Sequence, residues 1–277
     1  MHTEQVRLLL SSKPELVTSF PEWMLSPMVT KDLSCTPGVA IAEIAGRDSI
    51  AAVLAAVDQF SITTILPTVA YTGTEFGDWE VPIEKCRVLA QRLQNQSVRV
   101  LEPVFLGAPG FFWTVAGRYI SHLFGRFGFY TPCLACHLYL HAVRIPLAKS
   151  VGAALVISGE RERHGSRIKL NQVGVALDAY ARFMQQFGVD LLMPLRYTDS
   201  SEQIEGFVGS DWKEGGDQVQ CVLSKNYVDL HGTVSWSESA VRRFFEEFAL
   251  PVSETIVRAY LNGRTPDYEG IRPPTVA

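Results

Sequence analysis

The sequence lacks a long uninterrupted apolar segment. Its most apolar stretch, from Val104 to Phe124, is broken by glycine, proline and arginine, whereas a transmembrane helix needs about 20 consecutive apolar residues. The chain also opens without the charged segment and apolar core of a secretory signal. These absences predict a soluble, cytoplasmic protein that has no membrane partner.

Charge is also scarce. Only 19% of the 277 residues are Asp, Glu, Lys or Arg, and the net charge is −4. This balance argues against a strongly basic surface for nucleic acids, although it leaves room for a local patch. The hydrophobic share of 47% is that of an ordinary globular protein with enough apolar material for a core. A chain of this length forms one large α/β domain or two small ones.

Cysteine is scarce too, with five residues, an odd number. In a reducing compartment, cysteines that are close in sequence bind metal or take part in catalysis more often than they form disulfides. Cys133 and Cys136 form a C-x-x-C pair, and Cys221 follows much later. Cys35 belongs to no such pattern. Cys86 lies on the apolar stripe of an expected helix, which predicts a core residue.

What the chain does have is an alternation of strand and helix patterns. Short apolar runs predict strands at 39–44, 62–66, 98–106, 153–157 and 190–193. Helical patterns fall at 50–57, 83–93, 137–151 and 171–187, and again at 237–248 and 253–261. This order predicts an α/β fold, a Rossmann-like parallel sheet with helices on both faces, followed by a short helical C-terminal region.

A glycine-containing turn joins the first expected strand to its helix. Gly46 lets the backbone approach a ligand, and the helix that follows offers unpaired N–H groups and a positive dipole end to an anion. Arg47 can add charge-assisted hydrogen bonds, and Ser49 a hydroxyl group. The turn therefore predicts a phosphate site, unless Asp48 and Ser49 only cap the helix.

A polar run leaves the fourth expected strand, from Ser158 and Gly159 to Gln172. A charge run is usually a solvated face. This one, however, lies at the carboxyl end of a buried strand, where the ligands of parallel sheets bind. The residues that we expect to contact substrate, through charge, amide groups or a general base, are Glu160, Arg161, Arg163, His164, Lys169, Asn171 and Gln172.

Four segments, in order, resemble the motifs of the PP-loop ATP pyrophosphatase superfamily. Residues 44–49 resemble its Ser-Gly-Gly-x-Asp-Ser motif, with the second glycine, the aspartate and the final serine matching and the first serine and glycine replaced. Residues 72–75 resemble its nucleotide-side loop, residues 152–159 its Gly-Ala strand that ends in Ser-Gly, and residues 191–195 its closing strand.

The resemblance implies a HUP-type PP-loop fold. Residues 36–225 would be the nucleotide-binding catalytic domain, residues 1–35 an N-terminal extension, and residues 226–277 a helical segment packed on the same domain. In this superfamily ATP is split between its α and β phosphates, a substrate oxygen is adenylated, and a nitrogen or sulfur nucleophile displaces AMP. Mg2+ shields the triphosphate, and Asp48 is the candidate to help hold it. The implied ATP-binding residues are Gly46, Arg47, Asp48, Ser49, Thr72, Gly73, Ser158 and Gly159.

The cysteine pattern resembles that of one group of enzymes within the superfamily. Three thiolates can hold an iron–sulfur cube with one iron left open, whereas a structural zinc site needs a fourth ligand. A C-x-x-C pair before the Ser-Gly strand and a lone cysteine after the closing strand resemble the cluster-dependent tRNA thiolases. This implies a 4Fe–4S cluster on Cys133, Cys136 and Cys221, whose open iron carries the sulfide. Two alternatives stay open: a Zn2+ ion with His137 or His141 as fourth ligand, and a metal-free redox dithiol.

We therefore expect an ATP-dependent sulfur transferase in which Asp48 and the three cysteines are catalytic. One alternative is an amide- or nitrile-forming ligase with a structural zinc site, and another is a nucleotide-binding module without catalysis. The thiolases carry further zinc-finger cysteines for tRNA, which this chain lacks. A small-molecule or nucleotide substrate with a sulfur donor is therefore favoured over tRNA. The oligomeric state is open, and a homodimer is compatible with the sequence.

Overall fold

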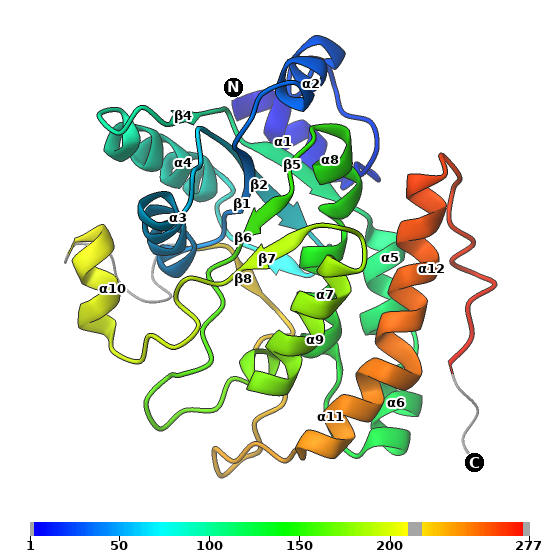
Figure 1. Ribbon diagram of the computed structural model, residues 1–277. Coiled ribbons are helices and arrows are strands. Elements are labelled where there is room, and N and C mark those ends of the chain that lie inside the picture. The colour runs from blue at the N-terminus through cyan, green and yellow to red at the C-terminus, as the bar shows by residue number, and fades with distance from the viewer. Residues whose placement is uncertain (1–2, 210–217, 274–277) are drawn as a thin grey trace.

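The computed structural model describes residues 3–209 and 218–273 and is built around a parallel sheet (Figure 1). Its strands are β1 (Val39–Glu43), β2 (Thr64–Tyr71), β4 (Arg99–Val100), β5 (Val104–Gly107), β6 (Leu155–Ile157) and β7 (Asp190–Leu192). The order across the sheet is β4-β2-β1-β6-β7, with β5 also paired to β2, and every pair in it is parallel. The predicted α/β fold with a parallel sheet is confirmed.

Strand β1 lies at the centre and is buried along its whole length. Ala40 is in register with Ile65 of β2 on one side and with Leu155 of β6 on the other. A central parallel strand reads as a continuous apolar run because helices cover both faces of such a sheet. Glu43, its last residue, is the exception, because it is charged and still buried.

Helices pack on both sides of the sheet (Figure 1). Toward one side lie α3 (Arg47–Gln59) and α4 (Glu80–Leu93), which follow β1 and β2. Toward the other lie α7 (Pro132–Ala142), α8 (Ile145–Ser150) and α9 (Gly174–Gln185). From β1 the chain adds β2 on one side and later adds β6 and β7 on the other, so the order in which strands are added reverses at β1. In such sheets the crevice outside the carboxyl ends of the strands at this switch point is where ligands bind.

Two proline-dependent breaks differ from the sequence prediction. The strand expected at 98–106 is two short strands, β4 and β5, with Pro103 between them, because proline has no N–H for the sheet. The helix expected at 137–151 starts earlier, with Pro132 in the first turn of α7, and is divided before Pro146 in the first turn of α8. Proline is well tolerated only in a first turn. The C-x-x-C pair therefore lies on α7 itself.

The N-terminal segment forms two helices, α1 (Thr3–Ser12) and α2 (Pro27–Ser34). Between them the backbone of Leu16 exchanges hydrogen bonds with Gly107 of β5, at 2.7 and 3.0 Å. Val6 of α1 and Leu33 of α2 are buried in the core. The segment is therefore packed on the sheet-containing body.

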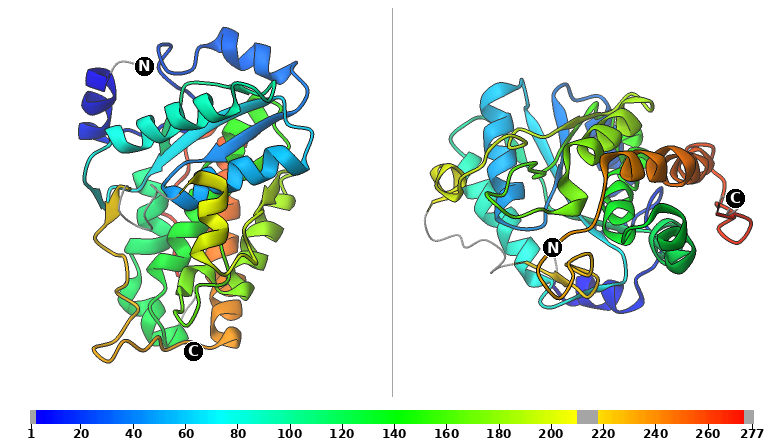
Figure 2. Two further views of the ribbon diagram at one scale, coloured as in Figure 1. Left: turned by 90° about the vertical axis from the view of Figure 1, so that its left-hand side faces the viewer. Right: turned by 90° about the horizontal axis from the view of Figure 1, so that it is seen from below.

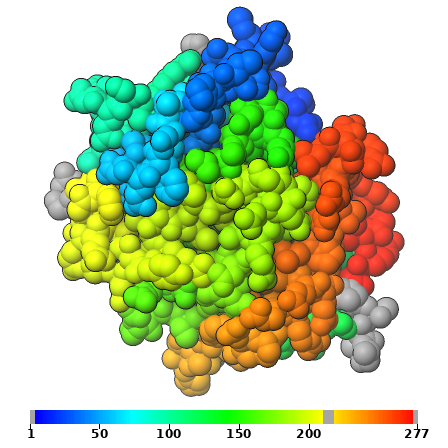
Figure 3. All heavy atoms as spheres, viewed as in Figure 1, coloured from blue at the N-terminus to red at the C-terminus, as the bar shows by residue number. Residues whose placement is uncertain are grey.

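The C-terminal helices are α11 (Glu238–Phe244) and α12 (Leu250–Leu261), joined by a π-helical turn (Phe245–Ala249). They run beside the green helices, among them α5 (Pro109–Phe112) and α6 (Ile120–Phe127), as Figure 2 shows. A second π-helical turn (Trp113–Gly117) lies between α5 and α6, and a 3-10 turn (Leu170–Gln172) precedes α9. Helix α10 (Ser201–Val208) packs on α3 (Figure 3). A separate antiparallel pair, β3 (Glu75–Phe76) with β8 (Gln220–Cys221), lies at the edge of the candidate site.

Candidate active site

The turn between β1 and α3 leaves the helix end open. Gly46 is the N-cap residue, and no side chain caps the helix. The Ser49 hydroxyl accepts from the Ala45 N–H (3.1 Å) and donates to the Gly46 carbonyl (2.7 Å), so it braces the turn instead. Asp48 and Ser49 therefore do not act as simple helix caps, which was the alternative prediction. An uncapped N-terminus offers its first N–H groups to an anion.

Two glycines let other segments come close to this turn. A Cβ on Gly159, which follows β6, would lie 2.6 Å from the backbone nitrogen of Ser49. A Cβ on Gly46 would lie 2.5 Å from the Gln218 side-chain oxygen. A larger residue at position 159 would push the two backbones apart, whereas at position 46 the Gln218 side chain would have to move. The loops after β1 and β6 can therefore touch at the switch point.

Asp48 and Arg47 connect the turn to the loop after β6 and to α10. Its two carboxylate oxygens accept from Arg47 Nε (3.0 Å) and from Arg161 Nε (2.8 Å), and both arginines are buried. Arg47 also donates to the Ser201 hydroxyl of α10 (2.8 Å). Asp48, predicted from the resemblance to help hold Mg2+, is thus engaged in an ion pair on each of its two oxygens.

A cavity of about 620 Å³ opens over the turn. It lies at the carboxyl ends of β1 and β6, at the point where the strand order reverses. The predicted residues that line it are Gly46, Arg47, Asp48, Ser49, Ser158, Gly159, Glu160, Lys169 and Gln172. The structure therefore brings the expected phosphate turn and much of the polar run to one space.

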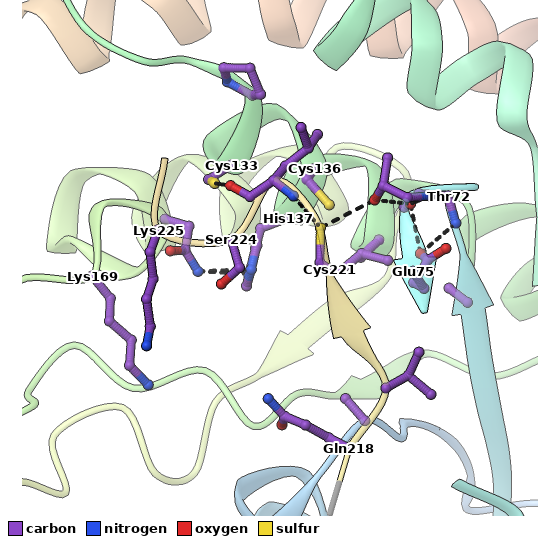
Figure 4. Close-up of a pocket in the computed structure, with 18 of the residues that line it drawn as sticks. Thr72, Glu75, Cys133, Cys136, His137, Lys169, Gln218, Cys221, Ser224 and Lys225 are labelled. Atoms are coloured by element: carbon purple, nitrogen blue, oxygen red, sulfur yellow. Dashed lines mark hydrogen bonds between the residues drawn. The ribbon is translucent and has the colours of Figure 1, made fainter. Parts of the chain in front are cut away.

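A second cavity, of about 360 Å³, holds the three cysteines (Figure 4). Cys133 and Cys136 are in the first turn of α7, and Cys221 comes from β8. The pairing of β8 with β3, in which Cys221 faces Glu75, carries the distant cysteine to this place. The three residues predicted as one site are thus brought together by tertiary contacts.

The cysteine environments differ. Burial raises the pKa of Cys133 to about 12, with a further contribution from Cys221, and it also raises the pKa of Cys136 well above the ordinary value. The Cys133 thiol lies 3.6 Å from the Leu223 carbonyl, to which it donates. Cys221 accepts from the Leu223 N–H at 3.4 Å. Cys86 lies in the core, as predicted, and Cys35 is exposed.

The cysteine cavity has donor atoms that suit a metal, but its side chains are not arranged to hold one. Three thiols sharing one cavity are the soft donors that iron–sulfur clusters and zinc require. Within residues 3–209 and 218–273, however, no group of three or more His, Cys, Asp or Glu side chains is arranged to hold a metal ion. Neither the cluster nor the zinc ion is therefore shown.

The two histidines considered as zinc ligands have other partners. His137 lines the cysteine cavity, but its Nδ1 lies 2.5 Å from Glu160 Oε1 and its Nε2 lies 2.8 Å from the Asn171 amide nitrogen. His141 is buried against Glu43, with 2.8 Å between Nδ1 and Oε1. Zinc ligation by His137 would require it to give up one of these contacts. His141 can bind through Nε2 and keep its contact with Glu43, but it does not line the cysteine cavity.

A buried charge network at the switch point was missed by the sequence analysis. Glu43 ends β1 and contacts both His141 and Arg144, the latter at 3.4 Å. His141 Nε2 lies 3.5 Å from Glu160, which also accepts from Gln172. Glu43 and Glu160 line the larger cavity. One signal could have found Glu43, because it is an acidic residue at the end of an otherwise apolar strand.

The network is held in its charged form. Burial alone would lower the pKa of His141, but Glu43 and Glu160 outweigh it and raise that pKa to about 9. Burial alone would raise the pKa of Glu160, yet His137 and His141 hold it far below its usual range. The pKa of Glu43 is likewise lowered, against burial, by His141 and Arg144. Two carboxylates therefore stay ionised beside the cavity at neutral pH.

The other predicted residues are more scattered. Thr72 lines the cysteine cavity, and Gly73 beside it has a φ of +101°. Arg163 is exposed and lies 5.9 Å from the ring centre of Tyr197. His164 is buried with its Nε2 2.9 Å from the Arg161 carbonyl, and burial lowers its pKa to about 4. Neither Arg163 nor His164 lines the two cavities described here.

The two cavities adjoin. Six polar side chains line both of them, namely His137, Lys169, Gln172, Gln218, Ser224 and Lys225. In Figure 4 the Lys169 and Lys225 side chains both extend away from the cysteines. Lys225 was not singled out from the sequence, and its φ of +66°, unusual for a residue with a side chain, gave no sequence signal.

No helix in the part of the chain that the structure describes has the length and apolarity to cross a bilayer. No family model matches the sequence. The crystal structure of a 4-thiouridine synthetase–RNA complex with bound ATP is similar with a TM-score of 0.48 and 16% sequence identity. The similarity covers 82% of this chain and 54% of that one, so the chain spans about half the length of that synthetase.

Among curated proteins, the uncharacterized protein MJ0009 of Methanocaldococcus jannaschii is 34% identical over 227 residues. The aligned part covers 81% of this chain and 82% of that protein. The chain therefore belongs to the same protein family as MJ0009.

Proposed function

We propose that this chain is an ATP-dependent enzyme of the PP-loop class that activates a substrate oxygen by adenylation and replaces it with sulfur. Residues 36–225 would form the catalytic domain. The observation that carries the proposal is the contact between two cavities, one over an uncapped helix end and one lined by three cysteines. An activated substrate in the first cavity would lie beside sulfur chemistry in the second.

The turn at Gly46 supports the ATP part. Its helix end is open, the loop after β6 approaches it through Gly159, and the 620 Å³ cavity is large enough for a nucleotide. The arginines on Asp48 keep positive charge next to the turn. We assign Gly46, Arg47, Asp48, Ser49, Ser158 and Gly159 to the triphosphate, and Thr72 and Gly73 to the nucleoside side.

The junction of the two cavities supports a polar, anionic substrate. Lys169 and Lys225 place two positive side chains there, while the acidic groups of the larger cavity are engaged by histidines and arginines. Asn171 and Gln172 add amide groups at the same place. We assign the substrate to this junction, with Glu160 as a fixed acceptor. Arg161 positions Asp48, and Arg163 and His164 are assigned no direct contact.

In the reaction, the substrate oxygen attacks the α-phosphorus of ATP, and pyrophosphate leaves. A sulfur nucleophile then forms a bond to the activated carbon, and AMP departs with the original oxygen. The sulfur is supplied as sulfide, so the replacement of oxygen by sulfur involves no change of oxidation state. Cys133, Cys136 and Cys221 would hold a 4Fe–4S cluster, which supplies an open iron coordination position for sulfide. The cysteines and Thr72 keep that sulfur in the cavity next to the substrate.

Metal analysis and pyrophosphate release test the proposal together. We expect anaerobically purified protein to hold about four irons and four sulfides per chain and to release pyrophosphate from ATP when substrate is present. Cys221→Ala should lose the metal, and Cys35→Ala, a change at an exposed cysteine, should keep it. Zinc without iron would instead favour the amide- or nitrile-forming ligase. ATP binding without pyrophosphate release under any condition would leave a non-catalytic module.

A further inference from the structure

One short stretch of chain, residues 218–221, spans the site from one cavity to the other. Gln218 and Val219 line both cavities, whereas Cys221 lines only the cysteine cavity. Four residues of extended chain cover about 10 Å between the first and the last. Figure 4 shows Gln218 at one end of this stretch and Cys221 at the other. We call residues 218–221 the bridging segment.

One end of the bridging segment rests on the phosphate turn. A Cβ on Gly46 would lie 2.5 Å from Gln218 Oε1, 3.4 Å from its Cβ and 3.5 Å from its Cδ. The Gln218 side chain therefore lies along the turn over much of its length. Gly46 itself has a φ of −144°, in the extended region that other residues also adopt. Glycine is thus needed at position 46 for the space that it leaves to Gln218, and not for its dihedral angles.

The other end of the bridging segment is fixed to the loop after β2. There β8 pairs antiparallel with β3, and the Val222 N–H donates to the Thr74 carbonyl at 3.1 Å. The same loop carries Thr72 and Gly73, which the proposed function assigns to the nucleoside. The bridging segment therefore joins the two parts of the proposed nucleotide site, one after β1 and one after β2.

The chemistry of the Gln218 side chain suits a phosphate neighbour. A side-chain amide has one acceptor oxygen and an NH2 group with two donors. The oxygen faces Gly46 in the structure, and half a turn about the terminal side-chain bond exchanges oxygen and nitrogen within nearly the same space. The NH2 group would then stand beside the open end of α3 and add a donor to its free N–H groups.

We propose that Gln218 is a nucleotide-binding residue, whose amide donates to a phosphate of ATP and fastens the bridging segment over the bound nucleotide. The inference rests on the proposed function for the identity of its ligand. It goes beyond that function because it assigns a phosphate contact to a segment that also forms a wall of the cysteine cavity. Bound ATP therefore fixes this wall as well.

Calorimetry with ATP and Mg2+ tests the contact through Gln218→Ala and Gln218→Glu. The Ala variant should bind ATP about tenfold more weakly, which is the effect of losing one hydrogen bond to a charged group. The Glu variant should bind more weakly still, because a carboxylate of the same size only accepts and repels phosphate. The same two changes at Gln186, which is exposed at the end of α9, should leave the affinity unchanged. Equal or tighter binding by Gln218→Ala would overturn the inference.

Hydrogen exchange measured by mass spectrometry tests the fastening of the bridging segment. In the wild type, saturating ATP should slow backbone exchange in residues 218–222, and in Gln218→Ala, also saturated with ATP, this slowing should be lost. Helix α12 serves as the internal reference in each sample. Equal slowing in both proteins would contradict the proposal.

The two measurements also separate this inference from the proposed function. A wild type that binds no ATP would overturn both. A wild type that binds ATP with the same affinity as Gln218→Ala and Gln218→Glu would overturn only the role of Gln218 and leave the proposed ATP chemistry in place.

Discussion

The buried histidine at the switch point makes the stability of the fold depend on pH in a defined window. His141 is fully enclosed, with Glu43 on β1 and Glu160 after β6 as its charged partners. The Tyr180 ring of α9 lies 5.0 Å from it, and Arg144 sits on the far side of Glu43. Replacing His141 with glutamine keeps a polar side chain there but removes the proton that folding binds.

The size of the effect follows from the pKa. Folding raises the pKa of His141 from its ordinary value of 6.5 to about 9. At about 1.4 kcal/mol for each tenfold change in proton affinity, this is a contribution of about 3 kcal/mol to the free energy of unfolding. Because the folded pKa is the higher one, the contribution is complete below about pH 6.5 and is lost as the pH rises through about 9.

Denaturant unfolding between pH 6 and 10 measures this contribution. The unfolding free energy of the wild type, minus that of His141→Gln, should fall by about 3 kcal/mol across the window. The exposed His231 provides a matched control, since His231→Gln should leave the pH dependence of the wild type unchanged. If wild type and His141→Gln show parallel pH profiles, His141 does not bind its extra proton in the folded state, and the description of the network is wrong.

Three further predictions concern packing around the site. Gly159→Ala should weaken ATP binding, measured by calorimetry, at least about tenfold and should lower the free energy of unfolding by about 1–3 kcal/mol. The reason is that the new Cβ meets the Ser49 backbone at 2.6 Å. The control is Gly125→Ala, where the space is open. Asp48→Asn removes the charge shared by two buried arginines and should cost about 2–3 kcal/mol of unfolding free energy, so an unchanged denaturation midpoint would contradict the ion pairs. Tyr139→Phe leaves the buried Ala108 N–H without its 2.8 Å acceptor and should cost about 1–3 kcal/mol, measured by the same titration, where equal midpoints would show that another acceptor replaces the phenol.

Local patterns predicted most of the architecture. The apolar runs at 39–44 and 153–157 became β1 and β6, because strands buried on both faces need apolar residues throughout. The turn at Gly46 was predicted as an open helix end at the edge of a strand, and the structure has that geometry. Some boundaries differed at Pro103, Pro132 and Pro146, where a missing N–H decides between continuing and restarting an element. The strand predicted at 62–66 also differs, because β2 continues to Tyr71.

The sequence also named the three cysteines, but not their surroundings. Spacing indicates that the Cys133 and Cys136 thiols can face one metal, since they form a C-x-x-C pair. No local pattern shows that Cys221 will pair through β8 with the loop after β2, because that contact joins segments far apart in the chain. The same holds for Lys225, which enters the site through a turn whose conformation the sequence does not mark.

By itself, then, the sequence determined the class of fold and the place of the glycine-containing turn, because backbone geometry and burial act on neighbouring residues. Only the tertiary structure decided which charges meet. Glu43, His141 and Glu160 come from three elements, and their ionised state depends on being buried together, since each alone would lose its charge there. The position of Cys221 is likewise set by strand pairing across the molecule, and spacing along the chain does not encode such a contact.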